Sequence, residues 1–227
     1  MIKITWLGQA GLLLEKDGFK IMVDPYLSDS VSKRDARKFR RVPVREDLLE
    51  IKPDVMIFTH NHIDHYDPET ALWFIGKESR ITVLTPNSVW QEVRKAGGEN
   101  NFVLFDAGTT WTEGGITFTA VKAEHSDPDA IGIIIDDGEK KYYITGDTLY
   151  NEKIFQDIPE DIYAIFLPIN GVGNNLNMVD AVKFCERIKP KFAVPLHWGM
   201  LDDLEVKEFA YESSVIPKVY EEILFVK

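Results

Sequence analysis

The chain has 227 residues, 44% of them hydrophobic, a formal net charge of −11 and one cysteine, Cys185. This size and composition predict a single domain over residues 1–227 with its own core, and one cysteine excludes an intrachain disulfide. The negative charge disfavours nucleic acid and anionic membranes as partners. No apolar run approaches the roughly 18 residues of a membrane span, and the first residues lack a long apolar signal region, so we expect a cytoplasmic protein.

Most of the chain is predicted to form short strands with three helices between them. Turn residues such as Asp17-Gly18 and Asp137-Gly138 separate apolar or alternating runs. The strands are expected at 2–7, 11–15, 19–23, 54–59, 81–84, 102–105, 116–122, 130–136, 140–145, 163–168 and 192–196. The helices are expected at 68–75, 87–96 and 178–188. This order favours a layered α/β domain with antiparallel or mixed sheets.

Three of the five histidines stand in one motif, His60-Asn61-His62-Ile63-Asp64-His65, directly after the strand predicted at 54–59. Imidazole is the commonest metal-binding side chain, and carboxylate is a usual partner. Residues i and i+2 on extended backbone point the same way, so His60 and His62 can hold one metal. Asp64 and His65 lie further round and can face a neighbouring position. A solvated polar loop is the alternative, which the scarcity of histidine elsewhere in the chain disfavours.

Three further candidates each follow a predicted strand: His125 after 116–122, Asp147 after 140–145 and His197 after 192–196. Each has an ordinary alternative when taken singly, either a hydrogen-bonded histidine or a turn aspartate. The ends of strands can hold ligands rigidly while their loops leave a position open for substrate. Together with the motif, these residues predict a metal site that uses every histidine in the chain.

This ordered set of histidines and aspartates resembles the metallo-β-lactamase-fold superfamily from Asp24 to His197. The resemblance implies a four-layer αββα sandwich of the α/β class, with a two-metal site at one edge. It further implies that a first metal is held by His60, His62 and His125, and a second metal by Asp64, His65 and His197. Asp147 would bridge the two metals, and Asp24 would support the ligand loop from behind.

Departures from particular branches narrow this resemblance. True β-lactamases of the fold commonly use cysteine where Asp147 stands, and di-iron flavoproteins usually have glutamate where His62 stands. Antibiotic hydrolysis and the reduction of oxygen or nitric oxide are therefore disfavoured. The wider context is similar to the ascorbate-6-phosphate lactonase branch, whose enzymes are manganese-dependent lactone hydrolases. The similar stretches are Trp6-Leu7-Gly8-Gln9-Ala10-Gly11, Asp24-Pro25-Tyr26-Leu27-Ser28-Asp29, Gly146-Asp147-Thr148-Leu149-Tyr150 and Pro168-Ile169-Asn170-Gly171.

We therefore expect a metal-dependent hydrolase of a small anionic lactone or ester. Two divalent ions, Zn²⁺ or Mn²⁺ with iron as a further candidate, would lower the pKa of bound water and supply a metal-bound hydroxide. Asp147 would orient that hydroxide and Asp64 would accept its proton. A phosphodiesterase or nuclease is one alternative, weakened by the lack of an extended basic track. A non-catalytic metal-binding protein is the other, and the sequence leaves a homo-oligomer open.

Two segments contain weaker candidates for contacts with substrate. The basic stretch 33–41 includes Arg34, Arg37 and Arg40, which could clamp a phosphorylated small molecule because guanidinium matches phosphate geometry. The alternative is a solvated surface segment. Asn170 opens a loop rich in glycine and asparagine whose amides could face substrate, and the alternative is a loop that ends in the helix cap Asn177.

Overall fold

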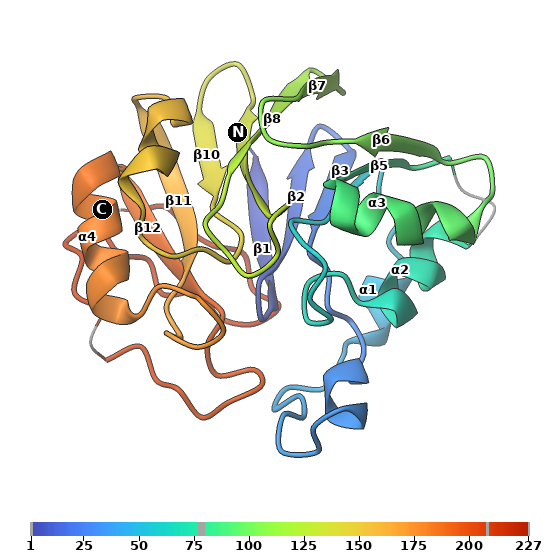
Figure 1. Ribbon diagram of the computed structural model, residues 1–227, viewed down its shortest axis with the longest axis horizontal. Coiled ribbons are helices and arrows are strands. Elements are labelled where there is room, and N and C mark those ends of the chain that lie inside the picture. Colours follow the sequence, from blue (N-terminus) through green and yellow to red (C-terminus); the bar gives the residue numbers. More distant parts are fainter. Residues whose placement is uncertain (1, 77–79, 208, 227) are drawn as a thin grey trace.

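The computed structural model describes residues 2–76, 80–207 and 209–226, which form two six-stranded sheets (Figure 1). The first sheet contains, in order, β1 (Lys3–Gly8), β2 (Gly11–Lys16), β3 (Phe19–Val23), β4 (Val55–Ile57), β5 (Thr82–Thr85) and β6 (Asn101–Leu104). The second contains, in order, β12 (Phe192–Leu196), β11 (Ile162–Pro168), β10 (Lys141–Ile144), β9 (Ile131–Asp136), β8 (Ile116–Lys122) and β7 (Thr110–Glu113).

Both sheets are mixed, and the connections explain why. Short turns join β1, β2 and β3 as antiparallel neighbours, and β7 to β10 are likewise antiparallel. The pairs from β3 to β6 and from β10 to β12 are parallel, and parallel pairing needs a longer crossover connection. Those connections hold α1 (Glu46–Leu49), α2 (Pro68–Ile75), α3 (Asn87–Val93) and α4 (Met178–Ile188), and the short turns η1 (Ser30–Lys33), η2 (Arg94–Ala96) and η3 (Glu152–Asp157).

Alternation along the strands builds a four-layer sandwich. Leu12 and Leu14 on β2 face the core between the sheets, whereas Leu13 faces the layer of α1–α3. On β9, Ile133 and Ile135 face the same central core, whereas Ile134 packs in the cluster under α4. Figure 1 shows helices outside both sheets. The αββα architecture expected from the sequence is confirmed.

Three differences from the predicted elements have simple causes. The strand β7 was missed because its Thr-Trp-Thr-Glu sequence is polar; cross-strand hydroxyl contacts with β8 support it, at 3.3 Å for Thr110–Thr119 and 3.0 Å for Thr112–Thr117. The helix predicted over 87–96 is α3 followed by the tighter turn η2, ending at Gly97 with φ of 68°. The segment 28–47, in which no helix or strand was predicted, contains η1 and the start of α1.

Strand direction places many carboxyl ends at one edge of the sandwich, at the bottom of Figure 1. Two successive antiparallel pairings bring β1 into the direction of β3, and β8 into the direction of β10. The parallel strands β4, β11 and β12 end at the same edge. The residues that follow these strands and carry polar side chains are Gln9, Asp24, His60, His125, Asp147, Asn170 and His197. Within the described ranges, no helix is long and apolar enough to cross a membrane.

Candidate metal centre

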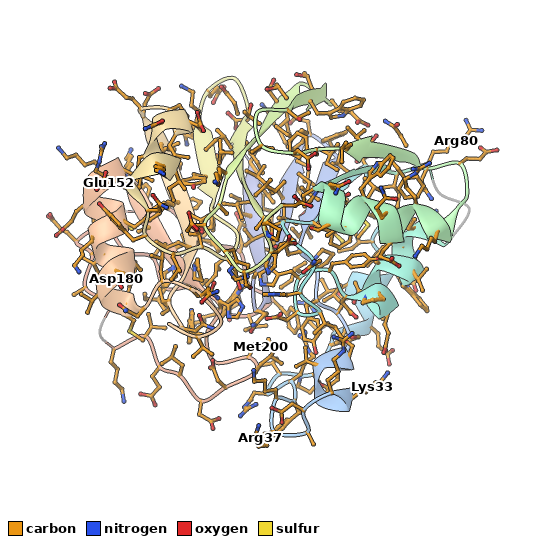
Figure 2. The ribbon with its side chains drawn as sticks, in the orientation of Figure 1. Lys33, Arg37, Arg80, Glu152, Asp180 and Met200 are labelled. Atoms are coloured by element: carbon orange, nitrogen blue, oxygen red, sulfur yellow. The ribbon has the colours of Figure 1, made fainter. Side chains whose placement is uncertain are left out.

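All seven ligands predicted from the sequence meet at this edge. They form two groups, and within each group one ligand atom per residue lies within 4.8 Å of all the others. The first ligand group is His60, His62, His125 and Asp147, and the second ligand group is Asp64, His65 and His197. Figure 2 labels Met200, Lys33 and Arg37 at this end of the molecule, beyond the sheets.

Two buried imidazoles each have one nitrogen that makes no hydrogen bond to a described residue. The Nδ1 atom of His60 lies 3.0 Å from Thr59 Oγ1, and the Nδ1 atom of His65 lies 2.8 Å from Asp24 Oδ2. Both side chains are fully buried, yet neither Nε2 atom has a hydrogen-bond partner among the described residues. A buried polar atom without a hydrogen bond costs free energy, so one such atom in each ligand group fits a cation bound by each group.

His62 and His125 aim two more nitrogens at the first group. His62 Nδ1 lies 3.1 Å from His125 Nε2, while His125 Nδ1 donates to the carbonyl oxygen of Asn174 at 3.2 Å. That contact fixes the tautomer in which His125 Nε2 carries the lone pair. The three histidines of the first group can therefore all present lone pairs to one ion.

Asp147 lies between the two groups. Its Oδ1 is 3.3 Å from His65 Nε2, whereas its Oδ2 is 3.4 Å from His197 Nε2 and 3.9 Å from His60 Nε2. The buried Asn175 donates from Nδ2 to Asp147 Oδ2 at 2.8 Å and holds the carboxylate in place. Asp147 can thus contribute to both groups, as expected of a bridging ligand.

The second group is enclosed by amides. Asp64 Oδ2 lies 3.1 Å from His197 Nε2 and accepts a 2.8 Å hydrogen bond from Gln9 Nε2. On the other side of the ring, Asn170 Nδ2 lies 2.9 Å from His197 Nδ1. Asn170, a weaker candidate for substrate contact in the sequence, therefore lies where it orients the imidazole of His197.

Protonation differs between the groups in the metal-free protein. Burial, reinforced by the charge of His65, pulls the pKa of His60 well below its usual range. For His197, burial alone would lower the pKa, but Asp147 and Asp64 outweigh it and raise the pKa to about 10. Asp147 and Asp24 likewise overcome burial and raise the pKa of His65. The carboxylates of Asp64 and Asp147 stay ionised, since the neighbouring histidines hold each pKa below its ordinary value despite burial.

Asp24 supports the motif from behind, as the resemblance implied. Its Oδ1 accepts from the backbone N–H of Thr59 at 2.8 Å, and its Oδ2 accepts from Thr59 Oγ1 at 2.6 Å as well as contacting His65. Asp24 adopts a left-handed φ of 44°, and Gln9 and His197 do so at 50° and 61°. Such backbone is uncommon outside glycine and marks strand ends held by surrounding contacts.

Sequence reasoning missed the role of Asp127. This residue is buried, and its Oδ2 accepts from the N–H of Asn61 at 3.0 Å and from Ser88 Oγ at 2.6 Å. It therefore ties the motif to the start of α3. Its place two residues after His125 was the one available signal. Gln9 and Asn175 were likewise recognisable only as polar turn residues.

The basic stretch divides into three different environments. Arg40 is buried, and its guanidinium donates to the carbonyl oxygens of Tyr26 and Val42 and to the hydroxyl of Tyr220. These contacts account for Arg40 without a substrate. Arg37 pairs with Asp35 in solvent, with 2.9 Å between Nη2 and Oδ2. Only Arg34 lines a cavity beside the motif, so the three arginines do not form one clamp.

Comparisons with known proteins agree with this geometry. Residues 20–198 match the family described as the beta-lactamase superfamily domain. A UPF0173 metal-dependent hydrolase from Carboxydothermus hydrogenoformans is 31% identical over 207 residues, covering 87% of this chain and 85% of that protein. Among solved structures, a metallo hydrolase from Ignicoccus hospitalis has a TM-score of 0.77 at 21% identity, covering 98% of this chain and 97% of that one. A possible metal-dependent hydrolase from Veillonella parvula has a TM-score of 0.78 at 17% identity, covering 98% and 99%.

These comparisons confirm the superfamily and the fold, and they refine the resemblance drawn from the motif. The relatives described above carry the name of a metal-dependent hydrolase family, without a substrate, rather than that of the ascorbate-6-phosphate lactonases. The chain belongs to the beta-lactamase superfamily and, within it, to the UPF0173 metal-dependent hydrolase family.

Proposed function

We propose that this protein is a two-metal hydrolase of a small anionic lactone or ester. The observation that carries this proposal is the meeting of two ligand groups around Asp147, where the buried Nε2 atoms of His60 and His65 have no hydrogen bond to a described residue. A metal-binding protein without turnover is disfavoured because His62 and His125 are only partly buried, so that solvent and substrate can reach the first group.

The residues of the first ligand group would hold one divalent ion and those of the second another, with Asp147 shared. Such ions, when bound, supply a hydroxide nucleophile near neutral pH and polarise a carbonyl oxygen. Asp64 remains ionised and can accept a proton at Oδ1, because Oδ2 already accepts from Gln9 Nε2. The hydrogen bond from Asn175 fixes the Asp147 carboxylate in its position between the two groups.

The charge distribution supports a small substrate. With a net charge of −11, the chain repels nucleic acid, and one exposed arginine, Arg34, lines the cavity beside the motif. A single guanidinium suits one anionic group on a small molecule better than a phosphodiester backbone. The similarity of the Trp6–Gly11 and Gly146–Tyr150 stretches to lactonases supports the carbonyl substrate class.

The test combines elemental analysis with a substrate panel. Purified protein should contain two transition-metal ions per chain, and the metal-loaded chain should hydrolyse lactones or carboxylic esters. Asp147→Asn should lower kcat by at least about a thousandfold, since it removes the charge shared by both groups. Asp161→Asn is the matched control, because Asp161 is exposed and pairs with Lys141 away from the site. Cleavage of bis(4-nitrophenyl) phosphate alone, or of nothing in the panel, would refute the proposal.

A further inference from the structure

A cavity of about 810 Å³ lies beside the motif and is walled by α2, α3 and η2. Residues 61–64 also line it, so His62 of the first ligand group and Asp64 of the second both border this space. Pockets for small molecules typically have about 300–1,000 Å³. A molecule that reacts at the ligand groups therefore has room to extend along these helices.

The helical wall of the cavity has an apolar part, while Ser88, Glu92 and Lys95 make the rest of it polar. Ile75 and Val93 line it as buried side chains, and Leu72 lines it while 56% exposed. Tyr66, Ala71 and Ala96 also belong to the apolar part of the lining. A large apolar side chain exposed in a concave wall is stabilised when an apolar ligand removes it from water. The wall therefore favours a hydrocarbon portion of the bound molecule.

One cation at the cavity has no ion-pair partner among the described residues. The lining acids are already engaged: Glu92 Oε1 pairs with Lys95 Nζ at 2.6 Å, and Asp64 contacts Gln9 and His197. Arg34 is exposed, and its guanidinium makes no ion pair with any residue that the structure describes. The neighbouring Lys33 pairs with Glu69 in the first turn of α2, which anchors this segment beside the cavity (Figure 2).

We propose that this cavity binds an apolar portion of the substrate and that Arg34 faces an anionic group on the same molecule. The substrate class is then an ester or lactone of an amphiphilic acid, with several carbons beyond the reacting carbonyl. This inference rests on the proposed function, because it takes the ligand groups as the place of reaction. It adds the specificity that the ligand groups themselves lack.

Binding tests the apolar portion directly. Calorimetric titration of the metal-loaded full chain with acetate, butanoate, hexanoate and octanoate should show affinity rising about threefold to fourfold per added methylene. Leu72→Glu places a charge in the apolar wall and should flatten this series. The matched variant Leu104→Glu alters a leucine that is 42% exposed on β6 and does not line the cavity, so the series should persist.

Turnover tests the anionic group. Arg34→Gln should raise KM about tenfold for the 4-nitrophenyl monoester of a dicarboxylic acid such as suberate, because a charge-assisted hydrogen bond is lost. KM for the neutral 4-nitrophenyl octanoate should not change. Arg187→Gln, on α4 under the other sheet, serves as the charge-matched control and should alter neither value.

The outcomes separate this inference from the proposed function. A flat carboxylate series, or equal effects of Leu72→Glu and Leu104→Glu, would overturn the cavity inference even if esters are hydrolysed. An equal rise in KM for anionic and neutral esters would remove the role of Arg34. Binding that depends on chain length and on Leu72, in a protein that hydrolyses no ester or lactone, would support the cavity while refuting the proposed hydrolysis.

Discussion

The two ligand groups lie side by side but are prepared for metal in different ways. In the first, burial lowers the pKa values of His60 and His125, so these two imidazoles are uncharged at neutral pH. The second holds protons on His65 and His197, whose pKa values are raised by surrounding carboxylates. Neighbouring sites in one cluster can therefore differ in their metal affinity because their outer contacts differ, even where the ligand types are similar.

The largest effects on metal content and activity are expected when one histidine is removed from either group. His60→Ala should eliminate the ion of the first group and lower kcat by at least about a thousandfold. His197→Ala should leave the first group filled, so that elemental analysis finds one ion per chain. Identical loss of both ions in the two variants would show that the groups bind metal only as a unit.

Asp24 should matter to the second group more than to the first, because it contacts His65 directly. Asp24→Ala leaves the Thr59 N–H and His65 Nδ1 without their acceptor, which should cost about 2–3 kcal/mol in the free energy of unfolding. Metal affinity of the second group should fall about 10–100-fold. Urea unfolding and metal titration measure the two effects. Asp54→Ala provides the comparison, since Asp54 accepts from the N–H of Lys20 away from the site.

The pH dependence of metal binding should differ between the two groups. Protons held by His65 and His197 must leave before these side chains can bind metal, so affinity of the second group should rise with pH below the raised pKa of about 10. The first group needs no such loss from His60 and should fill at lower pH. We expect about one ion per chain near pH 6 and two near pH 8.5 when the free-metal concentration is buffered at the same value. Parallel filling at every pH would contradict this order.

The smallest effect is expected at Asn175, whose side-chain amide donates one hydrogen bond to the shared carboxylate. Asn175→Ala removes one charge-assisted hydrogen bond to Asp147 and should weaken binding of both ions about tenfold without unfolding the protein. Asn101→Ala, exposed on β6, is the control. A change confined to one group would show that Asp147 does not bridge.

The sequence predicted which candidate ligands come together, because their pattern is local or follows clear strands. The motif from His60 to His65 is contiguous, and His125, Asp147 and His197 each follow a clear apolar strand. The four layers came from the family resemblance, and the strand order was not predicted, since pairing between distant strands leaves no trace in one sequence. Asp127 and Asn175 escaped prediction because a buried aspartate or asparagine that holds another loop looks like any turn residue. Arg40 was misleading for a related reason: its acceptors are mainly backbone carbonyls.

Each ligand group draws side chains from loops of both sheets, His60 to His65 from the first and His125, Asp147 and His197 from the second. A pair of bound cations would thus cross-link the two sheets at the edge where the ligand loops lie. Resistance to heat and proteases should consequently follow the supply of metal as well as the packing of the core. A shortage of metal would therefore shorten the lifetime of the folded protein and also abolish its activity.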